Sequence, residues 1–355
     1  MTIVDNPDLR PLDHLIEPRW SAGAPWIATD EYTIDCAEYG MDHHSLRAGS
    51  DLATRMRETY DAVGLVVLVN TGLAELAEMR AFATLIVDAE MDYAGGANPR
   101  DRIEANVYEV GAPLEAWLHY HHEMAYVGKS TRVISLLCKD ALPGRGSTFV
   151  SDSIAATDAL LATDFGQKLK ELGVCYVRNL TDRDSFEDQV EYGVYNHWQK
   201  SFQTDDCRVA ERQARARRLA VDWGPNRLMN TRYYCPAFEY YPNLDRNVLY
   251  CSVADHGMWF DTWPLVQHLP YEDRPLNMTF GDDSEISRDE LQQFVDLYDR
   301  FGTEIDWRVG DIAIIDNYRF AHGRPGIRLG DGETRTLGVV LGEQYDRVGV
   351  ITDKW

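Results

Sequence analysis

The stretch Leu118-His-Tyr-His-His-Glu-Met-Ala-Tyr126 organises our interpretation of this chain. Side chains along an extended strand alternate between its two faces, so His119, His121 and Glu123 are expected on one face. Two histidines and one carboxylate on one side of a metal ion, with the other positions open, form the ligand set of non-haem Fe(II) oxygenases. His121 and Glu123 would supply two of these ligands. The third must come from a distant part of the chain.

The best candidate for the third ligand is His322, in Asp316-Asn-Tyr-Arg-Phe-Ala-His-Gly-Arg-Pro325. A His-x-Glu pair alone is a weak signal, because a chain with 10 histidines and many acids produces one by chance. Of these histidines, however, only His121 is followed two positions later by an acid. One alternative stays open, in which His119 and His121 bind the metal as the His-x-His pair of a cupin.

Composition limits the function classes. The chain has 355 residues, of which 45% are hydrophobic and 26% charged, as in a soluble globular protein. Its net charge of −23 argues against a nucleic-acid partner, because proteins that bind phosphate backbones concentrate Lys and Arg. No apolar run approaches the roughly 20 residues that cross a bilayer. We therefore expect no nucleic-acid or membrane partner, and a homodimer or homotetramer is left open.

The cysteines and the N-terminus bear on the cellular compartment. The six cysteines contain no C-x-x-C pair and no spacing typical of a zinc site or a disulfide framework. Residues 1–19 contain Asp, Pro and Arg and lack the apolar core of a signal peptide. We expect a reduced, cytoplasmic protein.

The order of predicted elements indicates the fold. Helical spacing of apolar residues over 50–63 and 73–87 flanks the apolar run Gly64-Leu-Val-Val-Leu-Val69, which suits a buried strand. Beyond these, short strands and turns dominate. Further strands are expected at 103–110, 118–126, 132–138, 147–152, 172–177, 228–241, 247–253, 309–320 and 335–341, with helices at 153–161 and 287–301.

This pattern predicts an α+β protein with a mainly β core, a double-stranded β-helix of the jelly-roll or cupin type. N-terminal helices and a helical insertion at about 182–270 would accompany the barrel. Residues 1–50 show no clear period and are interpreted as an irregular arm or cap, and residues 51–355 as a single domain. No Gly-x-Gly-x-x-Gly follows a strand, which lowers the case for a nucleotide-binding fold.

Several separated segments carry a family resemblance. His121-His-Glu-Met-Ala-Tyr126 is similar to a His-Asn-Glu-Met-Ser-Tyr block, and Gly146-Ser-Thr-Phe-Val-Ser-Asp152 to a Gly-Glu-Thr segment ending in Asp. Gly310-Asp-Ile-Ala-Ile-Ile-Asp-Asn317, followed by His322-Gly-Arg324, resembles a strand with the distal ligand, and Arg335 lies thirteen residues after that histidine. These blocks belong to the TauD/TfdA, or clavaminate synthase-like, family of Fe(II)- and 2-oxoglutarate-dependent dioxygenases, which the chain resembles from about residue 60 onward.

The resemblance implies the site residues and the cofactors. His121, Glu123 and His322 would be the catalytic iron ligands, leaving positions for O2 and for two oxygens of 2-oxoglutarate. Arg335 would pair with the distal carboxylate of 2-oxoglutarate, because a guanidinium presents two parallel N–H donors. Thr148 would add a hydroxyl to that carboxylate. Ascorbate would support the reaction in vitro.

The implied activity is hydroxylation of an unactivated C–H bond of a small molecule, in specialised or amino-acid-like metabolism. Because halogenating relatives lack the acidic ligand, Glu123 argues for oxygenation rather than chlorination. Desaturation or cyclisation at the same centre is the alternative within the family. Alternatives from other classes are a zinc hydrolase with a metal-activated water and a non-catalytic metal-binding barrel. Candidate substrate contacts flank the ligands in sequence: Asn106, Tyr108, Tyr126, Arg319 and Phe320.

Two departures from the family pattern affect these expectations. Many relatives carry a second arginine four residues beyond the first, where this chain has Val339. The residue between the first two ligands is His122 rather than Asn. The contact to the metal-binding carboxylate of 2-oxoglutarate and the role of His122 therefore cannot be carried over.

Overall fold

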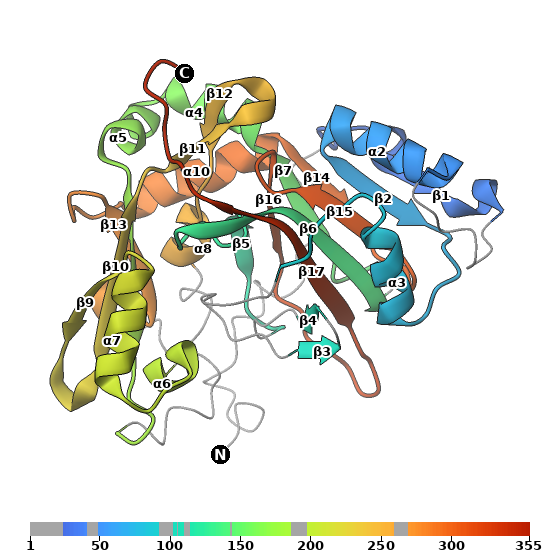
Figure 1. Cartoon of the computed structure of the whole chain (residues 1–355). Coiled ribbons are helices and arrows are strands. Elements are labelled where there is room, and N and C mark those ends of the chain that lie inside the picture. The colour runs from blue at the N-terminus through green and yellow to red at the C-terminus, as the bar shows by residue number, and fades with distance from the viewer. Residues whose placement is uncertain are drawn as a thin grey trace.

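The computed structural model describes residues 24–40, 49–91, 102–104, 106–109, 114–142, 144–185, 197–258 and 269–355. Within them, two sheets face each other and helices pack on their outer sides (Figure 1). Every helix in this part of the chain is too short or too polar to cross a lipid bilayer.

The larger sheet has seven strands, and all neighbours except β1 and β2 are antiparallel. Its order is β1 (Thr33–Asp35), β2 (Leu65–Val69), β15 (Ile312–Asp316), β6 (Lys129–Asp140), β17 (Thr336–Asp346), β4 (Val107–Glu109) and β3 (Arg102–Glu104). The long strands β6 and β17 pair from Thr336 and Asp140 at one end to Asp346 and Lys129 at the other. These two strands form one wall of the cavity described below.

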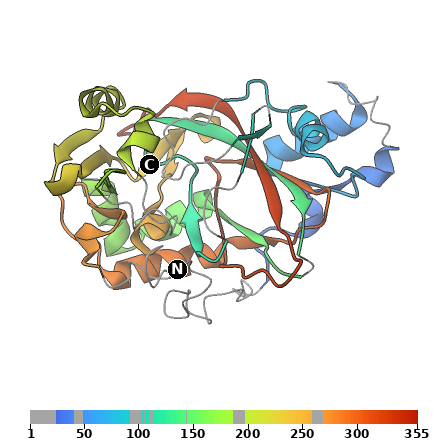
Figure 2. The same ribbon diagram turned by 90° about the horizontal axis from the view of Figure 1, so that it is seen from below.

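The smaller sheet is antiparallel and has the order β14 (Gly302–Ile305), β7 (Thr148–Asp152), β16 (Phe320–Arg324) and β5 (Leu118–His121). It packs against the inner face of the larger sheet, as the view in Figure 2 shows. Two facing sheets around a sheet-rich core correspond to the predicted jelly-roll architecture. Among the strands of the described residues, hydrogen bonding does not close the sheets into a barrel.

Alternation along the strands of the larger sheet separates two apolar clusters. On β15, Ala313 and Ile315 face the inter-sheet core, whereas Ile312 and Ile314 face the opposite side. There they meet the apolar stripes of α2 (Asp51–Val63) and α3 (Leu76–Ala83), which cover this face in Figure 1. Because both faces of these strands are buried, their sequences are continuous runs of apolar residues.

The N-terminal helices and caps agree with the sequence patterns in most respects. Ser50 caps α2, accepting a hydrogen bond from the backbone N–H of Ala53, and Gly64 ends the helix with a φ of 78°. The predicted helix at 73–87 is shorter, since α3 ends at Ala83. Asp152 caps α4 (Ser153–Leu161), and Ser287 caps α10 (Arg288–Arg300).

The prediction of an irregular arm is wrong for residues 29–39. This stretch forms α1 (Thr29–Tyr32), β1 and the 3-10 helix η4 (Cys36–Tyr39). A three-residue strand is too short to show a period, and its parallel pairing with β2 decides its conformation. The rest of the predicted arm, residues 1–23 and 41–48, lies outside the described residues.

A second lobe lies beside the two sheets. It contains the four-stranded sheet β13 (Leu276–Phe280), β8 (Val174–Leu180), β10 (Met229–Cys235) and β9 (Ala220–Trp223), and the hairpin of β11 (Phe238–Tyr241) and β12 (Arg246–Leu249). Its helices are α5 (Asp164–Leu172), α6 (Trp198–Phe202), α7 (Cys207–Ala216) and α8 (Val253–Met258), with 3-10 turns η6 (Pro225–Arg227), η7 (Pro242–Leu244) and η9 (Tyr271–Asp273). The insertion predicted at 182–270 is therefore mixed rather than helical, because its aromatic and β-branched segments form strands.

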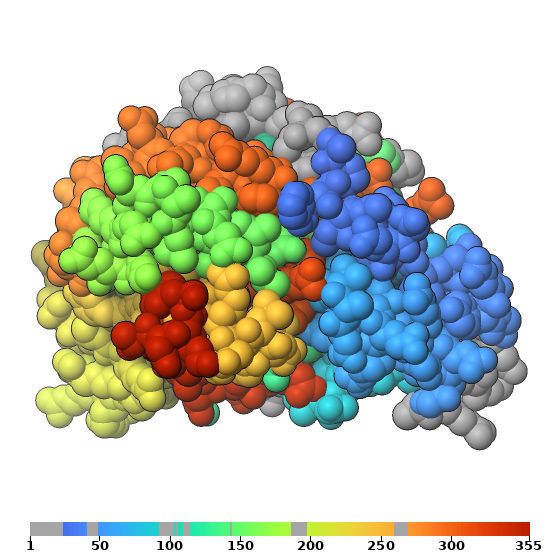
Figure 3. Space-filling view, turned by 90° about the horizontal axis from the view of Figure 1, so that it is seen from above, coloured from blue at the N-terminus to red at the C-terminus, as the bar shows by residue number. Residues whose placement is uncertain are grey.

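The C-terminal segment is fixed to this lobe, where Figure 3 shows it lying against the β11–β12 region. Arg347 donates from Nε to Glu239 at 2.9 Å, and the two side chains are buried. The second oxygen of Glu239 accepts the backbone N–H groups of Val348 and Gly349. All six cysteines are free thiols.

Candidate active site

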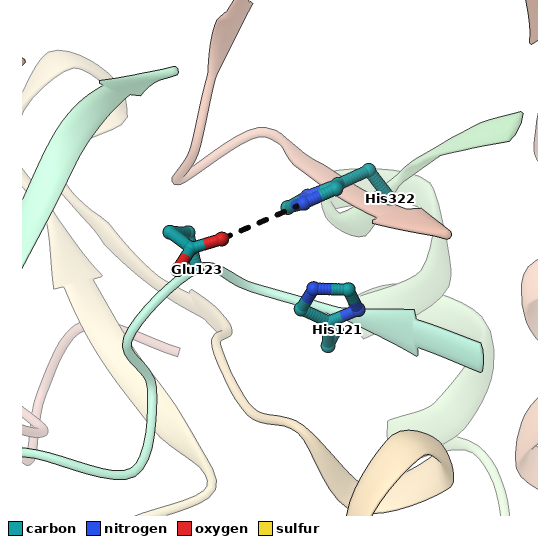
Figure 4. A group of neighbouring side chains, drawn as sticks. All are labelled: His121, Glu123 and His322. Carbon is teal, nitrogen blue, oxygen red and sulfur yellow. Dashed lines mark ion pairs between the residues drawn. The ribbon is translucent and has the colours of Figure 1, made fainter. Parts of the chain in front are cut away.

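The three residues predicted as metal ligands converge on one point (Figure 4). One donor atom from each of His121, Glu123 and His322 lies within 4.8 Å of the other two. Nε2 of His322 is 3.8 Å from Oε2 of Glu123, and the two imidazole centroids are 4.3 Å apart. Two imidazoles and one carboxylate at this spacing fit a single divalent ion with open positions.

Strand pairing places the two histidines side by side. In the antiparallel pair of β16 and β5, His322 lies opposite His121, and Arg324 lies opposite Leu118. Two steps on β16 thus match three steps on β5, which is a β-bulge. Because of the extra residue, Leu118 and His121 both line the cavity beside the metal cluster, and His119 does not. The expectation that simple alternation would place His119 with the ligands is therefore wrong.

The backbone carbonyl of His119 instead fixes the ring of His121. Nδ1 of His121 lies 2.8 Å from this oxygen and must donate, since a carbonyl only accepts. The tautomer with hydrogen on Nδ1 leaves the Nε2 lone pair for a metal. This geometry does not support a metal site formed by His119 and His121 as a cupin pair.

Glu123 lies just beyond the end of β5, and neighbouring side chains fix its position by hydrogen bonds to its backbone N–H and carbonyl groups. Asn317 accepts the Glu123 N–H at 2.8 Å and donates to the Glu123 carbonyl at 3.1 Å. The hydroxyls of Ser130 and Tyr250 donate to the same carbonyl, at 3.0 and 3.1 Å. The next residue, Met124, has a φ of 58°, a left-handed conformation that a non-glycine residue keeps only when its surroundings enforce it.

The three side chains that bind the Glu123 backbone, those of Asn317, Ser130 and Tyr250, were not predicted from the sequence. Asn317 ends the segment from Gly310 that resembles the family, but only the fold shows that its amide hydrogen-bonds to the Glu123 peptide. His122, whose role was left open, faces away from the cluster. It is buried, with Nε2 2.9 Å from Ser153 Oγ, and burial lowers its pKa to about 3. His122 is thus a neutral packing residue.

A cavity opens beside the cluster, between the two sheets. It contains about 460 Å³ of space free of protein atoms, part of it open to solvent. The smaller sheet contributes the histidines and Thr148, and the larger sheet contributes apolar side chains. The lining residues are Leu118, His121, Glu123, Ile134, Leu136, Thr148, His322, Gly323, Arg324, Arg335, Leu337 and Val339.

Arg335 lines this cavity just before β17 begins. It is only 9% exposed, and its Nε donates to the Gly146 carbonyl at 3.0 Å. Gly146 has a φ of 68°, and a Cβ there would lie 2.9 Å from Arg335 Nε, so the close approach requires glycine. The Nη2 atom of Arg335 is buried and has no hydrogen-bond partner in the described part of the chain. Burial lowers its pKa to about 10, so the guanidinium is still charged at neutral pH.

Thr148 lines the same cavity as this arginine. Its hydroxyl oxygen accepts a hydrogen bond from Trp307 Nε1 at 3.0 Å, which leaves its own hydrogen available to an acceptor in the cavity. An incompletely paired buried guanidinium and an oriented hydroxyl suit an anionic group. The residues therefore fit a ligand that reaches the metal cluster with one end and places a carboxylate at the other. Trp307 was not foreseen from the sequence.

A second arginine, Arg324, also lines the cavity. It follows His322 by two residues on β16 and therefore lies on the same face. Its Nη1 donates to the carbonyls of Leu114 and Ala116, both at 2.8 Å, which ties β16 to the segment before β5. Burial and the nearby charge of Arg335 together lower its pKa to about 9, against a smaller opposite effect of Asp255. Val339 lines the apolar wall, so the position of the relatives' second arginine carries no charge.

None of the five candidate substrate contacts lines this cavity. Asn106 donates to Glu90, and Arg319 donates to the Ala62 carbonyl at the end of α2. Phe320 is fully buried in the inter-sheet core. Tyr108 is buried opposite Val339, and Tyr126 packs against Tyr176 and His256.

The comparisons with known proteins agree with this geometry. The sequence profile of the family described as taurine catabolism dioxygenase TauD, TfdA family matches residues 31–341, and so begins within the predicted arm. A clavaminate synthase-like protein of Arabidopsis thaliana is 26% identical over 243 residues, which are 66% of this chain and 69% of the relative.

Two solved structures show the shared fold. A taurine dioxygenase from Burkholderia xenovorans aligns with a TM-score of 0.50 and 14% identity, over 89% of this chain and 87% of that one. AAD-2, solved with Mn(II) and N-oxalylglycine, also has a TM-score of 0.50 and 14% identity, over 90% and 96% of the two chains. Dioxygenases of the TauD family use Fe(II), 2-oxoglutarate and O2.

Proposed function

The chain belongs to the TauD/TfdA family of 2-oxoglutarate-dependent dioxygenases, and we propose that it hydroxylates an unactivated C–H bond of a small, amino-acid-like molecule. The observation that carries the proposal is the convergence of His121, Glu123 and His322 at one end of a cavity whose other end holds Arg335. The relative named clavaminate synthase-like supports a small-molecule substrate.

Each residue has a defined task in this proposal. His121 through Nε2, Glu123 through its carboxylate and His322 hold Fe(II). The guanidinium of Arg335 receives the distal carboxylate of 2-oxoglutarate, and Thr148 donates its hydroxyl hydrogen to the same group. A guanidinium with an unpartnered buried nitrogen gains more from such a partner than a solvated one would, since its desolvation has already occurred in the folded protein.

When bound, iron and 2-oxoglutarate supply the oxidising step, in which R–H, 2-oxoglutarate and O2 give R–OH, succinate and CO2. The protein positions and protects this chemistry. Apolar side chains from β6 and β17 line the wall opposite the ligands, so water has few hydrogen-bonding partners between them. The Asn317 clamp and the His119 carbonyl hold Glu123 and His121 in place before any ligand binds.

The test is an anaerobic titration of 2-oxoglutarate into the Fe(II)-loaded protein. We expect the weak visible metal-to-ligand charge-transfer band of the chelate to appear and to saturate. Succinate formation with ascorbate and O2 is then followed against a metabolite panel, and mass spectrometry distinguishes addition of oxygen from desaturation or cyclisation. Absence of the band in a folded, iron-loaded sample would contradict the cofactor and site assignments. Activity with zinc and without 2-oxoglutarate would indicate a hydrolase instead.

An arginine pair provides the matched control. Arg335→Gln should weaken 2-oxoglutarate binding strongly. Arg328→Gln removes a guanidinium from the nearby loop that pairs with Glu115 and does not line the cavity. We expect that variant to keep the affinity of the wild-type protein.

A further inference from the structure

Asp255, on the short helix α8, is a buried carboxylate that the proposed reaction does not use. Its side chain is 8% exposed. Its Oδ1 accepts the backbone N–H of His119 at 3.1 Å, which is its only hydrogen bond in the described part of the chain. No cation in that part forms an ion pair with it. Its second oxygen therefore has no donor in direct contact, and the positive groups that favour its ionised form, His121 and Arg324, act on it without forming an ion pair.

Two other buried carboxylates of this protein are more fully compensated. Glu239 pairs with Arg347 and accepts two backbone N–H groups, and Asp316 accepts the hydroxyl of Tyr241 and two backbone N–H groups. Satisfying one N–H requires only an acceptor, which a neutral asparagine would supply without the desolvation cost of a charge. The cap on His119 alone does not account for an ionisable group at position 255.

The position of Asp255 relates it directly to the metal cluster. The helix α8 packs against β5, and Asp255 binds the N–H of the residue whose carbonyl fixes the ring of His121. Two residues along a strand span roughly 7 Å. The carboxylate thus lies beside the strand that carries the first ligand. It is not among the residues that line the cavity with Arg335, so a group bound to it would not displace 2-oxoglutarate.

We propose that Asp255 is a substrate-binding residue and that the substrate carries a cationic nitrogen, a primary ammonium or a comparable N–H cation, which this carboxylate binds. The inference rests on the proposed function and narrows its substrate class. A cation supplies the donor that the second oxygen lacks and brings a positive charge into direct contact with it. Trp117 stacks on the ring of His119 with 5.6 Å between centroids, so an aromatic side chain lies next to the residue whose N–H Asp255 binds.

Paired probes test this on the holoenzyme. Aliphatic amino acids with terminal amines of graded length are compared with the analogues in which a hydroxyl replaces that ammonium. The readouts are the perturbation of the anaerobic charge-transfer band and the rate of succinate formation. We expect the best amine to bind about tenfold to a hundredfold more tightly than its hydroxyl analogue, the usual range for a charged hydrogen bond.

Asp255→Asn should remove this preference while leaving 2-oxoglutarate binding unchanged, because the amide oxygen still accepts the His119 N–H. Asp311→Asn is the matched control. Asp311 is also a buried carboxylate with one backbone partner, the N–H of Arg308, but it lies just before β15 in the larger sheet, whereas Asp255 contacts β5. That variant should keep the preference for amines.

The outcomes separate the two proposals. If the charge-transfer band never forms with 2-oxoglutarate, the proposed function fails. If the band forms but amines perturb it no better than their hydroxyl analogues, or no probe perturbs it, only the inference on Asp255 is overturned. Retention of the amine preference in Asp255→Asn would overturn it as well. The wild-type comparison needs no variant, so the inference can be tested even if Asp255→Asn does not fold.

Discussion

Two buried arginines near the two ends of β17 have opposite surroundings. Arg347 lies beyond the C-terminal end, against a fully buried Glu239 and the ring of Tyr250. Arg335 lies before the N-terminal end, in the cavity, with one hydrogen bond to a carbonyl and one unpartnered buried nitrogen. Within the described part of the chain, an anionic side chain pairs with the first arginine and none pairs with the second. A buried charge without a partner in a cavity indicates that a ligand binds there, whereas a buried charge that is paired indicates a structural role.

The largest expected effect is on stability at the paired end. Arg347→Met leaves Glu239 buried and uncompensated, and we expect it to lower the free energy of unfolding by about 3 to 5 kcal/mol. Denaturant unfolding of the metal-free protein measures this. Adding Glu239→Gln should recover much of the loss, because the amide still accepts the Val348 and Gly349 N–H groups. A loss below roughly 0.5 kcal/mol in the single variant, typical of surface changes, would show that the pair has no structural role.

At the unpaired end, the same kind of change should affect binding instead. Arg335→Leu removes a buried charge with no anionic partner, so we expect unfolding of the ligand-free protein to be unchanged or slightly harder. The affinity for 2-oxoglutarate should fall by about 2 to 5 kcal/mol, as when one member of a buried charge pair is truncated. Isothermal titration and thermal unfolding provide the two readouts. Destabilisation without loss of affinity would reverse the proposed contrast.

The hydrogen bonds between Asn317 and the Glu123 backbone allow the same comparison at the predicted metal ligands. Asn317→Ala removes hydrogen bonds to the peptide N–H and carbonyl of Glu123, and we expect metal affinity to fall about tenfold to a hundredfold, as for other residues that orient ligands. Competition with a chelator measures this. Asn277→Ala removes a buried amide from the second lobe and is the control. Equal affinities for metal in the two variants would contradict the role of Asn317.

Thr148→Val should give the smallest effect. The exchange preserves the shape of the side chain and removes one neutral donor, so affinity for 2-oxoglutarate should fall by about 0.5 to 1.5 kcal/mol. Because Trp307 then loses its acceptor, part of any loss in stability reflects the indole. Trp307→Phe separates the two contributions: it should restore stability in the double variant without restoring affinity. An affinity loss as large as that of Arg335→Leu would place the hydroxyl, rather than the guanidinium, at the centre of the anion site.

Patterns on single strands and helices made much of the fold predictable. The apolar run at 64–69, the helical spacing at 50–63 and the helical segment at 287–301 each predicted an element that the structure contains. The three converging metal-ligand candidates stood in short motifs whose chemistry could be recognised without the fold. Their assembly depends on the register of β5 and β16, which no local pattern encodes.

What the sequence could not reveal were effects of tertiary contacts. The bulge in β5 removes His119 from the ligand face, although simple alternation places it there. The candidate substrate contacts were chosen by closeness in sequence to the ligands, but none of them lines the cavity. Asp255 lies 132 positions after Glu123 in the chain and meets β5 only because α8 packs on it. Residues brought together by packing in this way have no signature in a single sequence.

A crystal structure of the protein with Mn(II) and N-oxalylglycine, with the metal located by anomalous scattering, tests the central claim most directly. It should show one metal bound by Nε2 of His121, the carboxylate of Glu123 and His322, with the distal carboxylate of the inhibitor paired to Arg335 and hydrogen-bonded to Thr148. A metal bound elsewhere, or an inhibitor carboxylate that leaves the Arg335 guanidinium unpaired, would contradict the account.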